Sequence, residues 1–309
     1  MFIDLHVQKG VGLEMLGRIF VCRQIMSLRS YSTVVPSTGT KPKVIHLRPS
    51  VDPVEVEHFS QLVNEWMDEN GSLKALHSFN RIRVPWILDE LKKQKSSVND
   101  DAVPLQGLRI LDVGCGSGIL SFPLIRLGAQ VDGLDVVQGC VDAGTSIADR
   151  ILPEKLRSSA RFVCSSVEQF AAEQENIEGM NKLVYLQRYC LAYDAIVASE
   201  VIEHVPNPNL FIRSCHRLLK PRSAIFFSTI NRTFLSQVVA VELAEGLNLT
   251  PKGTHDWNKF VTPHELRSLL LDNNFQVAYD RGLFYDPLVN EWAWFVVNQV
   301  NYALLARKP

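Results

Sequence analysis

The chain has 309 residues, a formal net charge of −1 at pH 7 and 46% hydrophobic residues. This composition is typical of a globular enzyme and lacks the basic surplus of proteins that bind nucleic acid, so no nucleic-acid partner is expected. The six cysteines form no Cys-x-x-Cys pair, which argues against a disulfide framework and a zinc site. No run of about 18 apolar residues occurs, so no segment is expected to span a membrane.

Residues 1–45 differ in kind from the rest of the chain. Their charged residues are Lys and Arg except for Asp4 and Glu14, and the segment Arg29–Thr33 is rich in hydroxyl groups. An amphipathic leader rich in Arg and Ser is typical of a mitochondrial transit peptide. We therefore predict a disordered transit peptide over these residues. The alternative is an ordinary disordered tail, because acidic residues are unusual in such leaders.

Helices are predicted first in chain order. Apolar residues recur at three- and four-residue steps from about residue 51, and a second helix is expected from Arg83 to Lys92. The polar stretch from Gln94 to Asp101 is typical of a linker. We expect one domain over 51–309, with N-terminal helices over 51–95 and the sheet that carries the site over 108–309.

Strands and helices then alternate regularly along the chain. The expected strands are 108–113, 130–135, 160–164, 194–199 and 224–229, and the helices between them are 118–127, 138–150, 166–174 and 208–219. Further helices are expected at 233–246 and 263–273, and two last strands at 276–282 and 300–307. Such alternation predicts parallel strands with right-handed crossovers, a Rossmann-like, doubly wound α/β sheet of seven strands whose end is antiparallel.

A glycine turn follows the first strand of this series, Asp112-Val113-Gly114-Cys115-Gly116-Ser117-Gly118. Glycines without side chains allow a ligand to lie directly on the backbone. Asp135 ends the next apolar run, where its carboxylate can accept hydrogen bonds from the two hydroxyls of a ribose. The two features together predict a cofactor that contains adenosine.

The order of the glycines indicates which cofactor this is. A dinucleotide fingerprint places a small residue three positions after its second glycine, but Ile119 stands three positions after Gly116. The pattern D-x-G-x-G-x-G instead resembles motif I of the class I S-adenosylmethionine-dependent methyltransferases. A nucleotide oxidoreductase is the alternative.

Three ionisable residues follow the strand expected at 194–199, namely Glu200, Glu203 and His204. Two carboxylates and one imidazole can form part of the shell of a magnesium ion. Alternatively, His204 can act as a general base near neutral pH. A third possibility is that Glu203 and His204 only cap the next helix. The residue pattern alone leaves these three interpretations open.

The chain from residue 51 to 308 resembles the ubiquinone-biosynthesis O-methyltransferase family. Besides the glycine turn and the Glu200–Pro206 segment, the motifs that carry the resemblance are Asn64-Glu65-Trp66, Lys74–Arg83, Ser228-Thr229-Ile230-Asn231-Arg232-Thr233 and Pro251-Lys252-Gly253-Thr254-His255. The last two, in this order, are far more particular than motif I.

The resemblance implies a function and a set of site residues. The residues that would bind S-adenosylmethionine are Arg83, Gly114, Gly116, Asp135 and Ser199. Those that would bind magnesium are Glu200, Glu203 and His204, of which Glu203 and His204 would also be catalytic. The magnesium ion would chelate both oxygens of a catechol and lower the pKa of the one to be methylated. For Arg83, a solvated surface charge is the alternative.

The resemblance also implies substrates, partners and a location. The substrates would be polyprenylated catechols, 3,4-dihydroxy-5-polyprenylbenzoate and demethylubiquinol. The enzyme would lie peripherally on the matrix side of the mitochondrial inner membrane, within a ubiquinone-biosynthesis protein complex. The alternatives are a metal-independent methyltransferase of another small phenol and a non-catalytic subunit of such a complex.

The sequence departs from the family pattern at a few places. Lys220-Pro221-Arg222-Ser223 lacks the usual Pro-Gly-Gly, so we expect that turn to use a backbone conformation open to residues with a Cβ. Residues 173–193 form an unusually long apolar connection, Asp286 replaces an expected Tyr-Asn-Pro, and Arg81 stands where proline is expected.

Three further features are weaker candidates for the site. His255 is expected in a loop over the site or as a packed structural residue, and Lys252 as a solvated charge. The apolar helix Phe234–Leu243 is expected in the core, with contact to a polyprenyl tail or a membrane as the alternative.

Overall fold

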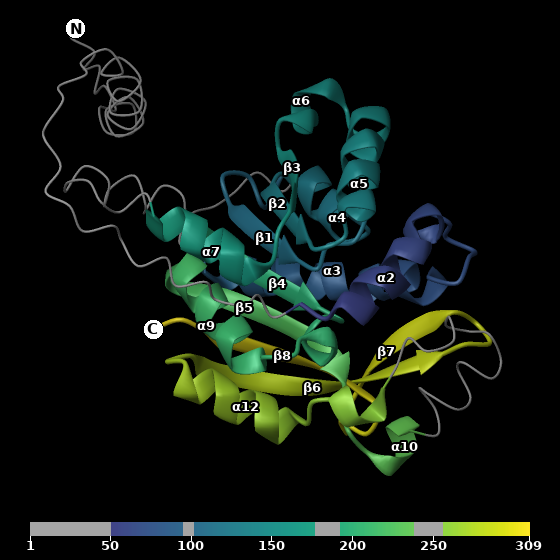
Figure 1. Cartoon of the computed structure of the whole chain (residues 1–309), viewed down its shortest axis with the longest axis vertical. Helices are drawn as coiled ribbons and strands as arrows, with labels where there is room; N and C mark the ends of the chain where they lie inside the picture. Colours follow the sequence, from purple (N-terminus) through teal and green to yellow (C-terminus); the bar gives the residue numbers. More distant parts are fainter. Residues whose placement is uncertain (1–50, 95–101, 177–191, 238–255) are drawn as a thin grey trace, which may run out of the picture. The chain divides into compact units, whose positions relative to one another are not determined.

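The computed structural model describes residues 51–94, 102–176, 192–237 and 256–309, and its strands form one sheet (Figure 1). The sheet has eight strands in the order β3-β2-β1-β4-β5-β8-β6-β7. The strands are β1 (Arg109–Val113), β2 (Gln130–Asp135), β3 (Ala160–Cys164), β4 (Tyr193–Ser199), β5 (Leu219–Ile230), β6 (Gln276–Asp286), β7 (Glu291–Phe295) and β8 (Asn301–Arg307). Strands β1 to β5 are parallel, and β8 runs antiparallel between β5 and β6. The predicted doubly wound α/β sheet is confirmed.

The predicted number of strands was wrong, because β7 was not expected. This strand pairs antiparallel with β6 at the edge of the sheet. Trp292 and Trp294 share one face of it, where Trp292 lies 4.6 Å from the ring of Phe79 and Trp294 lies 5.6 Å from that of Trp86. The alternation of Glu-Trp-Ala-Trp-Phe is the pattern of a strand with one face packed, and it went unrecognised.

The helices lie on both faces of the sheet (Figure 1). The longer ones are α2 (Pro53–Gln61), α3 (Lys74–Gln94), α5 (Gln138–Ile151), α7 (Val167–Asn176), α9 (Pro208–Leu218) and α12 (Pro263–Asp272). The shorter ones are η1 (Val63–Glu65), α4 (Ser121–Arg126), α6 (Glu154–Arg157), η3 (Ile202–His204), α10 (Phe234–Ser236) and η5 (Trp257–Lys259). The second predicted helix begins at Lys74 rather than at Arg83, so Arg83 lies in the middle of α3.

Local residues fix where several helices begin. The side chain of Asn207 accepts a hydrogen bond from the backbone N–H of Leu210, and Pro208 occupies the first turn of α9. Thr262 and Glu265 form a reciprocal capping box at the start of α12. These caps explain why the predicted helices 208–219 and 263–273 agree closely with the structure.

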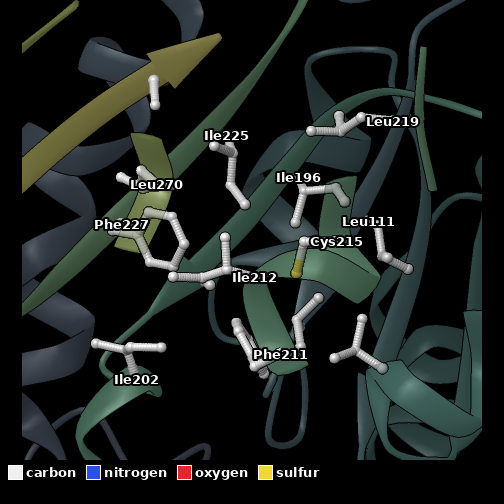
Figure 2. Packing of buried hydrophobic residues seen from close by; sticks show 14 of the residues in the cluster. Leu111, Ile196, Ile202, Phe211, Ile212, Cys215, Leu219, Ile225, Phe227 and Leu270 are labelled. Atoms are coloured by element: carbon white, nitrogen blue, oxygen red, sulfur yellow. The ribbon is translucent and has the colours of Figure 1, made fainter. Parts of the chain in front are cut away.

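One hydrophobic cluster lies on each face of the sheet. Ile196, Ile225 and Phe227 pack with Ile212 of α9 and Leu270 of α12 (Figure 2). Their sequence neighbours in the strands contribute to the second cluster, where Ala195, Val197, Ala224 and Phe226 meet α3, α4 and α5. Burial on both faces is what parallel strands with helical crossovers require, and it explains their continuous apolar runs.

The turn before the predicted fifth strand also differs from expectation. Strand β5 begins at Leu219, and Arg222 within it has φ +64°, in the left-handed region that favours glycine. The conformation expected from the absence of glycine was therefore wrong. Backbone hydrogen bonds explain it, because Arg222 N–H donates to the carbonyl of Lys308 and Lys308 N–H donates to that of Ser223, each at 2.9 Å.

Some predictions lie outside the described residues. These are the leader over 1–45, almost all of the linker, most of the 173–193 connection, the helix beyond Gln237, and Lys252 and His255. Within α10, Phe234 is 80% exposed rather than part of the core. In the part of the chain that the structure describes, none of the helices is long and apolar enough to cross a membrane.

The attachment of α3 to the sheet can be tested at Tyr279. Its hydroxyl accepts from Trp86 Nε1 at 3.0 Å and donates to Glu90 Oε1 at 2.9 Å. We expect Tyr279→Phe to lower the free energy of unfolding by about 1–3 kcal/mol, because it leaves the indole N–H of the buried Trp86 unpaired. Urea denaturation measures this change. Tyr285→Phe, which loses one bond to Asn290, is the control and should cost less; equal costs would contradict the role of Tyr279.

Candidate functional site

Residues at the carboxyl ends of β1, β2 and β4 meet at a cavity of about 130 Å³. Gly114, Asp135, Glu200 and His204 all line it, although they come from three different strands and span 90 positions of sequence. Ligands of open α/β sheets bind at this edge, so the structure brings four of the predicted site residues together where a ligand is expected.

The glycine turn is shaped by close neighbours as well as by its backbone. Gly114 has φ +68° and Gly116 has φ +54°. A Cβ on Gly114 would overlap the side chain of Val201, and one on Gly116 would overlap the ring of Trp66. Both positions therefore require glycine for two reasons, the positive φ and the lack of space for a Cβ. Gly116 is covered by Trp66 and does not line the cavity, which differs from the open loop expected from sequence.

Asp135 ties this turn to the end of β2. Its Oδ2 accepts from Gly116 N–H at 2.8 Å and its Oδ1 accepts from Val137 N–H at 2.9 Å. Burial raises the pKa of Asp135, while these backbone hydrogen bonds oppose that rise. Each carboxylate oxygen has a second lone pair, so the predicted contact with ribose hydroxyls is compatible with this arrangement.

Arg83 holds the end of β4 through a hydrogen bond to Ser199. It is 4% exposed, its Nη1 donates to Ser199 Oγ at 2.6 Å, and its Nε and Nη2 donate to Asn80 Oδ1. Burial lowers the pKa of Arg83 to about 10, and the negative charges of Asp112 and Glu200 partly offset this decrease. Arg83 is not a surface charge. Neither it nor Ser199 lines the cavity, so their predicted contact with the cofactor stays a prediction.

Glu200 holds a strained backbone conformation at the cavity. Its φ is +57°, which is uncommon for a residue with a side chain and is concentrated at functional sites. Burial raises the pKa of its carboxyl, and the nearby charge of Glu203 raises it further. Oε1 of Glu200 is buried without a hydrogen-bond partner. A buried unpaired oxygen in a cavity wall is suited to a ligand that donates hydrogen bonds or carries positive charge.

Glu203 and His204 are adjacent in η3 but have separate partners. Glu203 is 3% exposed and its Oε2 accepts from Thr229 Oγ1 at 2.9 Å, while His204 Nδ1 lies 3.0 Å from Glu55 Oε2. Among the described residues, no three His, Cys, Asp or Glu side chains are grouped so that they could hold a metal ion. The predicted magnesium ligands Glu200, Glu203 and His204 thus do not converge in this arrangement.

A second cavity, of about 600 Å³, lies between η3, η5 and α12. Its lining includes Glu203, Lys259 and Phe260. Asp52, His204 and Val205 line both cavities, so His204 stands in the wall between them. The larger cavity falls in the range of about 300–1,000 Å³ of small-molecule sites. An acceptor molecule there would face a ligand of the smaller cavity across His204.

Sequence reasoning missed three residues of this site. Glu55 and Lys259 contact the site from segments far away in sequence, and no local pattern marks them. Glu168 is 3% exposed, lines the smaller cavity and has a buried Oε1 without a partner. It follows the end of β3 at the same edge of the sheet, so the predicted end of that strand at 164 was a usable clue.

Comparison with known proteins gives consistent relatives. A family model described as a methyltransferase domain matches residues 78–279. The mitochondrial ubiquinone biosynthesis O-methyltransferase of Rattus norvegicus is 39% identical over 257 residues, which are 82% of this chain and 69% of that protein. The ubiquinone biosynthesis O-methyltransferase of Bradyrhizobium diazoefficiens is 36% identical over 262 residues, 83% of this chain and 93% of that protein.

A solved methyltransferase structure has a similar fold. The magnesium protoporphyrin IX methyltransferase of Synechocystis, solved with bound S-adenosylmethionine, has a TM-score of 0.52 and covers 82% of this chain and 97% of its own. Its sequence identity is 18%, so the likeness supports the fold alone.

The buried carboxyl beneath the glycine turn yields a test of stability against pH. Asp112 is 3% exposed and accepts from Ser121 Oγ at 2.6 Å, and burial raises its pKa from 3.8 to about 6. Between pH 3.8 and about pH 6 the folded chain holds a proton on Asp112 that the unfolded chain has released. The contribution of Asp112 to the free energy of unfolding therefore falls as pH rises.

We expect Asp112→Asn, which keeps an acceptor for Ser121, to be more stable than the wild type at pH 7 by up to about 3 kcal/mol. The difference should shrink as pH falls below about 4, where the wild-type carboxyl is also neutral. Urea denaturation at pH 7 and at pH 4 measures the difference in free energy of unfolding. A difference that is the same at pH 7 and pH 4 would contradict burial of a charged carboxyl as its cause.

Proposed function

The chain belongs to the ubiquinone biosynthesis O-methyltransferase family and carries its methyltransferase domain, and from this premise we propose that it methylates a hydroxyl of a polyprenylated catechol. The proposed acceptors are 3,4-dihydroxy-5-polyprenylbenzoate and demethylubiquinol, and the proposed methyl donor is S-adenosylmethionine. The observation that carries the proposal is the position of His204 in the shared wall of the two cavities. Direct transfer would take place at this shared boundary, where the methyl carbon and the acceptor oxygen have to approach to about 3–3.5 Å.

The residues of the smaller cavity fit S-adenosylmethionine chemically. Asp135 offers carboxylate oxygens to ribose hydroxyls, and Gly114 brings bare backbone to the cavity wall. The buried, unpartnered Oε1 of Glu200 suits the positive charge and the N–H groups of an amino-acid tail. When bound, this cofactor supplies a methyl group on a positively charged sulfur, which an oxygen nucleophile can take in one displacement.

The chain's own part in the reaction is to orient the acceptor and remove its proton. With Nδ1 of His204 held by Glu55, Nε2 is left to accept the proton of a phenol. Burial alone would lower the pKa of His204, but the hydrogen bond that Nδ1–H donates to Glu55 and the charges of Glu203 and Glu55 raise it above the ordinary value. No covalent intermediate with the enzyme is needed.

Magnesium does not fit the residues as they are arranged, so no step is derived through it. To act as ligands, Glu203 would have to leave Thr229 and His204 would have to leave Glu55. Magnesium binding by Glu200, Glu203 and His204 stays a prediction from the family resemblance. In its absence, proton removal by His204 is the mechanism that this geometry supports.

For the location, we propose the matrix side of the mitochondrial inner membrane, where a polyprenylated substrate resides, and a place in a ubiquinone-biosynthesis complex. The rat relative is named as mitochondrial. Eleven large hydrophobic side chains in the described part of the chain are exposed, and eight of them lie on α10, on the β6–β7 hairpin and just after β7. This apolar patch consists of Phe234, Leu235, Phe284, Leu288, Val289, Phe295, Val296 and Val297. A patch of this kind suits a lipid surface.

The catalytic proposal is tested by binding and turnover together. We expect the full chain to bind S-adenosylhomocysteine in calorimetry and to methylate a short-chain polyprenyl dihydroxybenzoate. Asp135→Ala should abolish both, because it removes the proposed ribose acceptor and releases the glycine turn. Asp149→Ala, which removes an exposed carboxylate of α5 that lines neither cavity, is the control and should retain both. A wild type that binds no cofactor would defeat the enzyme assignment.

The same assay with a chelator separates the two mechanisms. We expect turnover to persist when divalent cations are removed and to fall by about 100-fold or more in His204→Gln, as for loss of a general base. Turnover that is lost with chelator and restored by magnesium would instead support the predicted metal ligands.

The apolar patch is tested by binding to phospholipid vesicles. We expect the double variant Leu288→Glu/Val296→Glu to lower vesicle partitioning by about tenfold or more, because two buried side chains of this size contribute a few kcal/mol. Leu271→Glu, at an exposed position on α12 outside the patch, is the control. Cofactor affinity should not change in either protein. Equal partitioning of both variants would count against the patch as the membrane contact.

A further inference from the structure

The size of the smaller cavity raises the question of how a cofactor enters it. A volume of about 130 Å³ is well below the range of about 300–1,000 Å³ for small-molecule sites. The walls formed by β1, β2 and β4 belong to the central strands and their hydrophobic clusters. The rest of the lining includes buried residues, among them Trp66, Cys140, Val167, Glu168 and Phe211, and α2 with the residue before it, which contribute Asp52, Glu55, Val56 and Phe59. Because no residue of α2 is buried, movement of α2 is the enlargement that disturbs the core least.

Helix α2 is attached in a way that permits this movement. None of its nine residues is buried, and Val54 is 75% exposed. By contrast, α3 buries seven of its residues, including Phe79 and Ile87. Elements with few buried apolar contacts open at a lower free-energy cost than the core does. The hydrophobic effect alone therefore holds α2 only weakly over the cavity.

Polar contacts hold α2 in place instead. Lys259 Nζ donates to Glu55 Oε1 at 2.8 Å and to Asp52 Oδ2 at 3.0 Å, and the other oxygen of Glu55 lies 3.0 Å from His204 Nδ1. Glu55 thus bridges η5 on one side and η3 on the other. The ion pairs are partly shielded, since the side chain of Glu55 is 16% exposed and that of Lys259 is 38% exposed.

The same residues connect the two cavities. Lys259 lines the larger cavity, and Asp52 lines both. A molecule in the larger cavity therefore packs against the residue that holds α2 closed. If that contact favours the closed position, it must also strengthen retention of the ligand beneath α2, because coupling between two sites is reciprocal.

We propose that α2 is a movable cover of the cofactor cavity, and that Glu55 and Lys259 are positioning residues that hold it closed and couple cofactor retention to the acceptor cavity. This rests on the proposed function only in taking S-adenosylmethionine as the ligand beneath α2. The cofactor binds first, while α2 is open, and the acceptor then binds against the closed arrangement. Acceptor binding slows the release of the cofactor.

The test measures how fast S-adenosylhomocysteine dissociates from the full chain by stopped-flow displacement. We expect Lys259→Gln and Glu55→Gln each to raise the dissociation rate by about three- to tenfold, as for loss of partly shielded ion pairs. The double variant should show less than the product of the two effects, because both changes open the same contact. Lys259→Arg should restore a rate near that of the wild type.

Lys93→Gln is the matched control. It breaks the Lys93–Glu90 ion pair on α3, whose Nζ and Oε1 atoms lie 2.6 Å apart. Neither Lys93 nor Glu90 lines the cofactor cavity or the acceptor cavity. We expect its dissociation rate to equal that of the wild type. Hydrogen exchange adds a readout that general destabilisation would not reproduce, since in Lys259→Gln faster exchange should be confined to residues 53–61.

Two results would overturn the proposal. One is a dissociation rate that is unchanged in both Lys259→Gln and Glu55→Gln while the wild type binds the ligand. The other is faster hydrogen exchange spread over the whole sheet, which would show loss of fold rather than opening of α2. A wild type that binds no S-adenosylhomocysteine would instead defeat the proposed function itself, so the two failures are distinguishable.

Discussion

The site depends on how the end of β4 is held. Arg83 donates to Ser199, and the hydroxyls of Ser199 and Ser228 lie 2.6 Å apart across β4 and β5. Directly after this fixed point, Glu200 adopts its left-handed conformation and its N–H donates to the carbonyl of Ser228 at 2.8 Å. The chain is thereby turned out of the sheet at one residue, which directs Glu200 into the smaller cavity and places His204 between the two cavities. A buried guanidinium is costly unless its donors are used, and in this site Asn80 and Ser199 use them.

The regular part of the fold was predictable because each buried strand is a short apolar run between polar turns. The first four parallel strands and the helices α5, α9 and α12 were placed correctly from periodicity and caps, whereas β5 begins earlier than predicted, at Leu219. Strand β7 was not predicted, although its two tryptophans alternate with Glu291, Ala293 and Phe295. The backbone conformation of Arg222 was predicted wrongly, because its left-handed φ is imposed by hydrogen bonding to Lys308, more than eighty positions further along the chain. Such partners have no trace in a local pattern.

The same distinction separates the predicted from the missed site residues. Gly114, Asp135 and Glu200 lie at or directly after strand ends, and His204 lies in η3 shortly after β4, so the topology brings them to one edge of the sheet. Glu55 lies 149 positions from its partner His204 and 204 positions from Lys259, and nothing in its own segment indicates either contact. The magnesium prediction rests on the opposite kind of signal, closeness in sequence. Glu203 and His204 are neighbours in a 3₁₀ turn, where successive side chains point in different directions, and in this arrangement they have separate partners, Thr229 and Glu55.

The arrangement of the walls has a consequence for how the activity is divided along the chain. The strand ends of the methyltransferase domain supply the floor of the cofactor cavity, whereas α2, which precedes the matched residues 78–279, supplies its cover. The acceptor cavity is built from η3, which follows β4, and from η5 and α12, which follow β5. Asp52 and His204 line both cavities. A ligand in the acceptor cavity therefore contacts Lys259, and through its ion pairs with Asp52 and Glu55 it affects the position of α2. A fold shared by many methyltransferases can in this way be made specific for one acceptor without altering the strands that hold the donor, because the coupling runs through elements outside the central sheet.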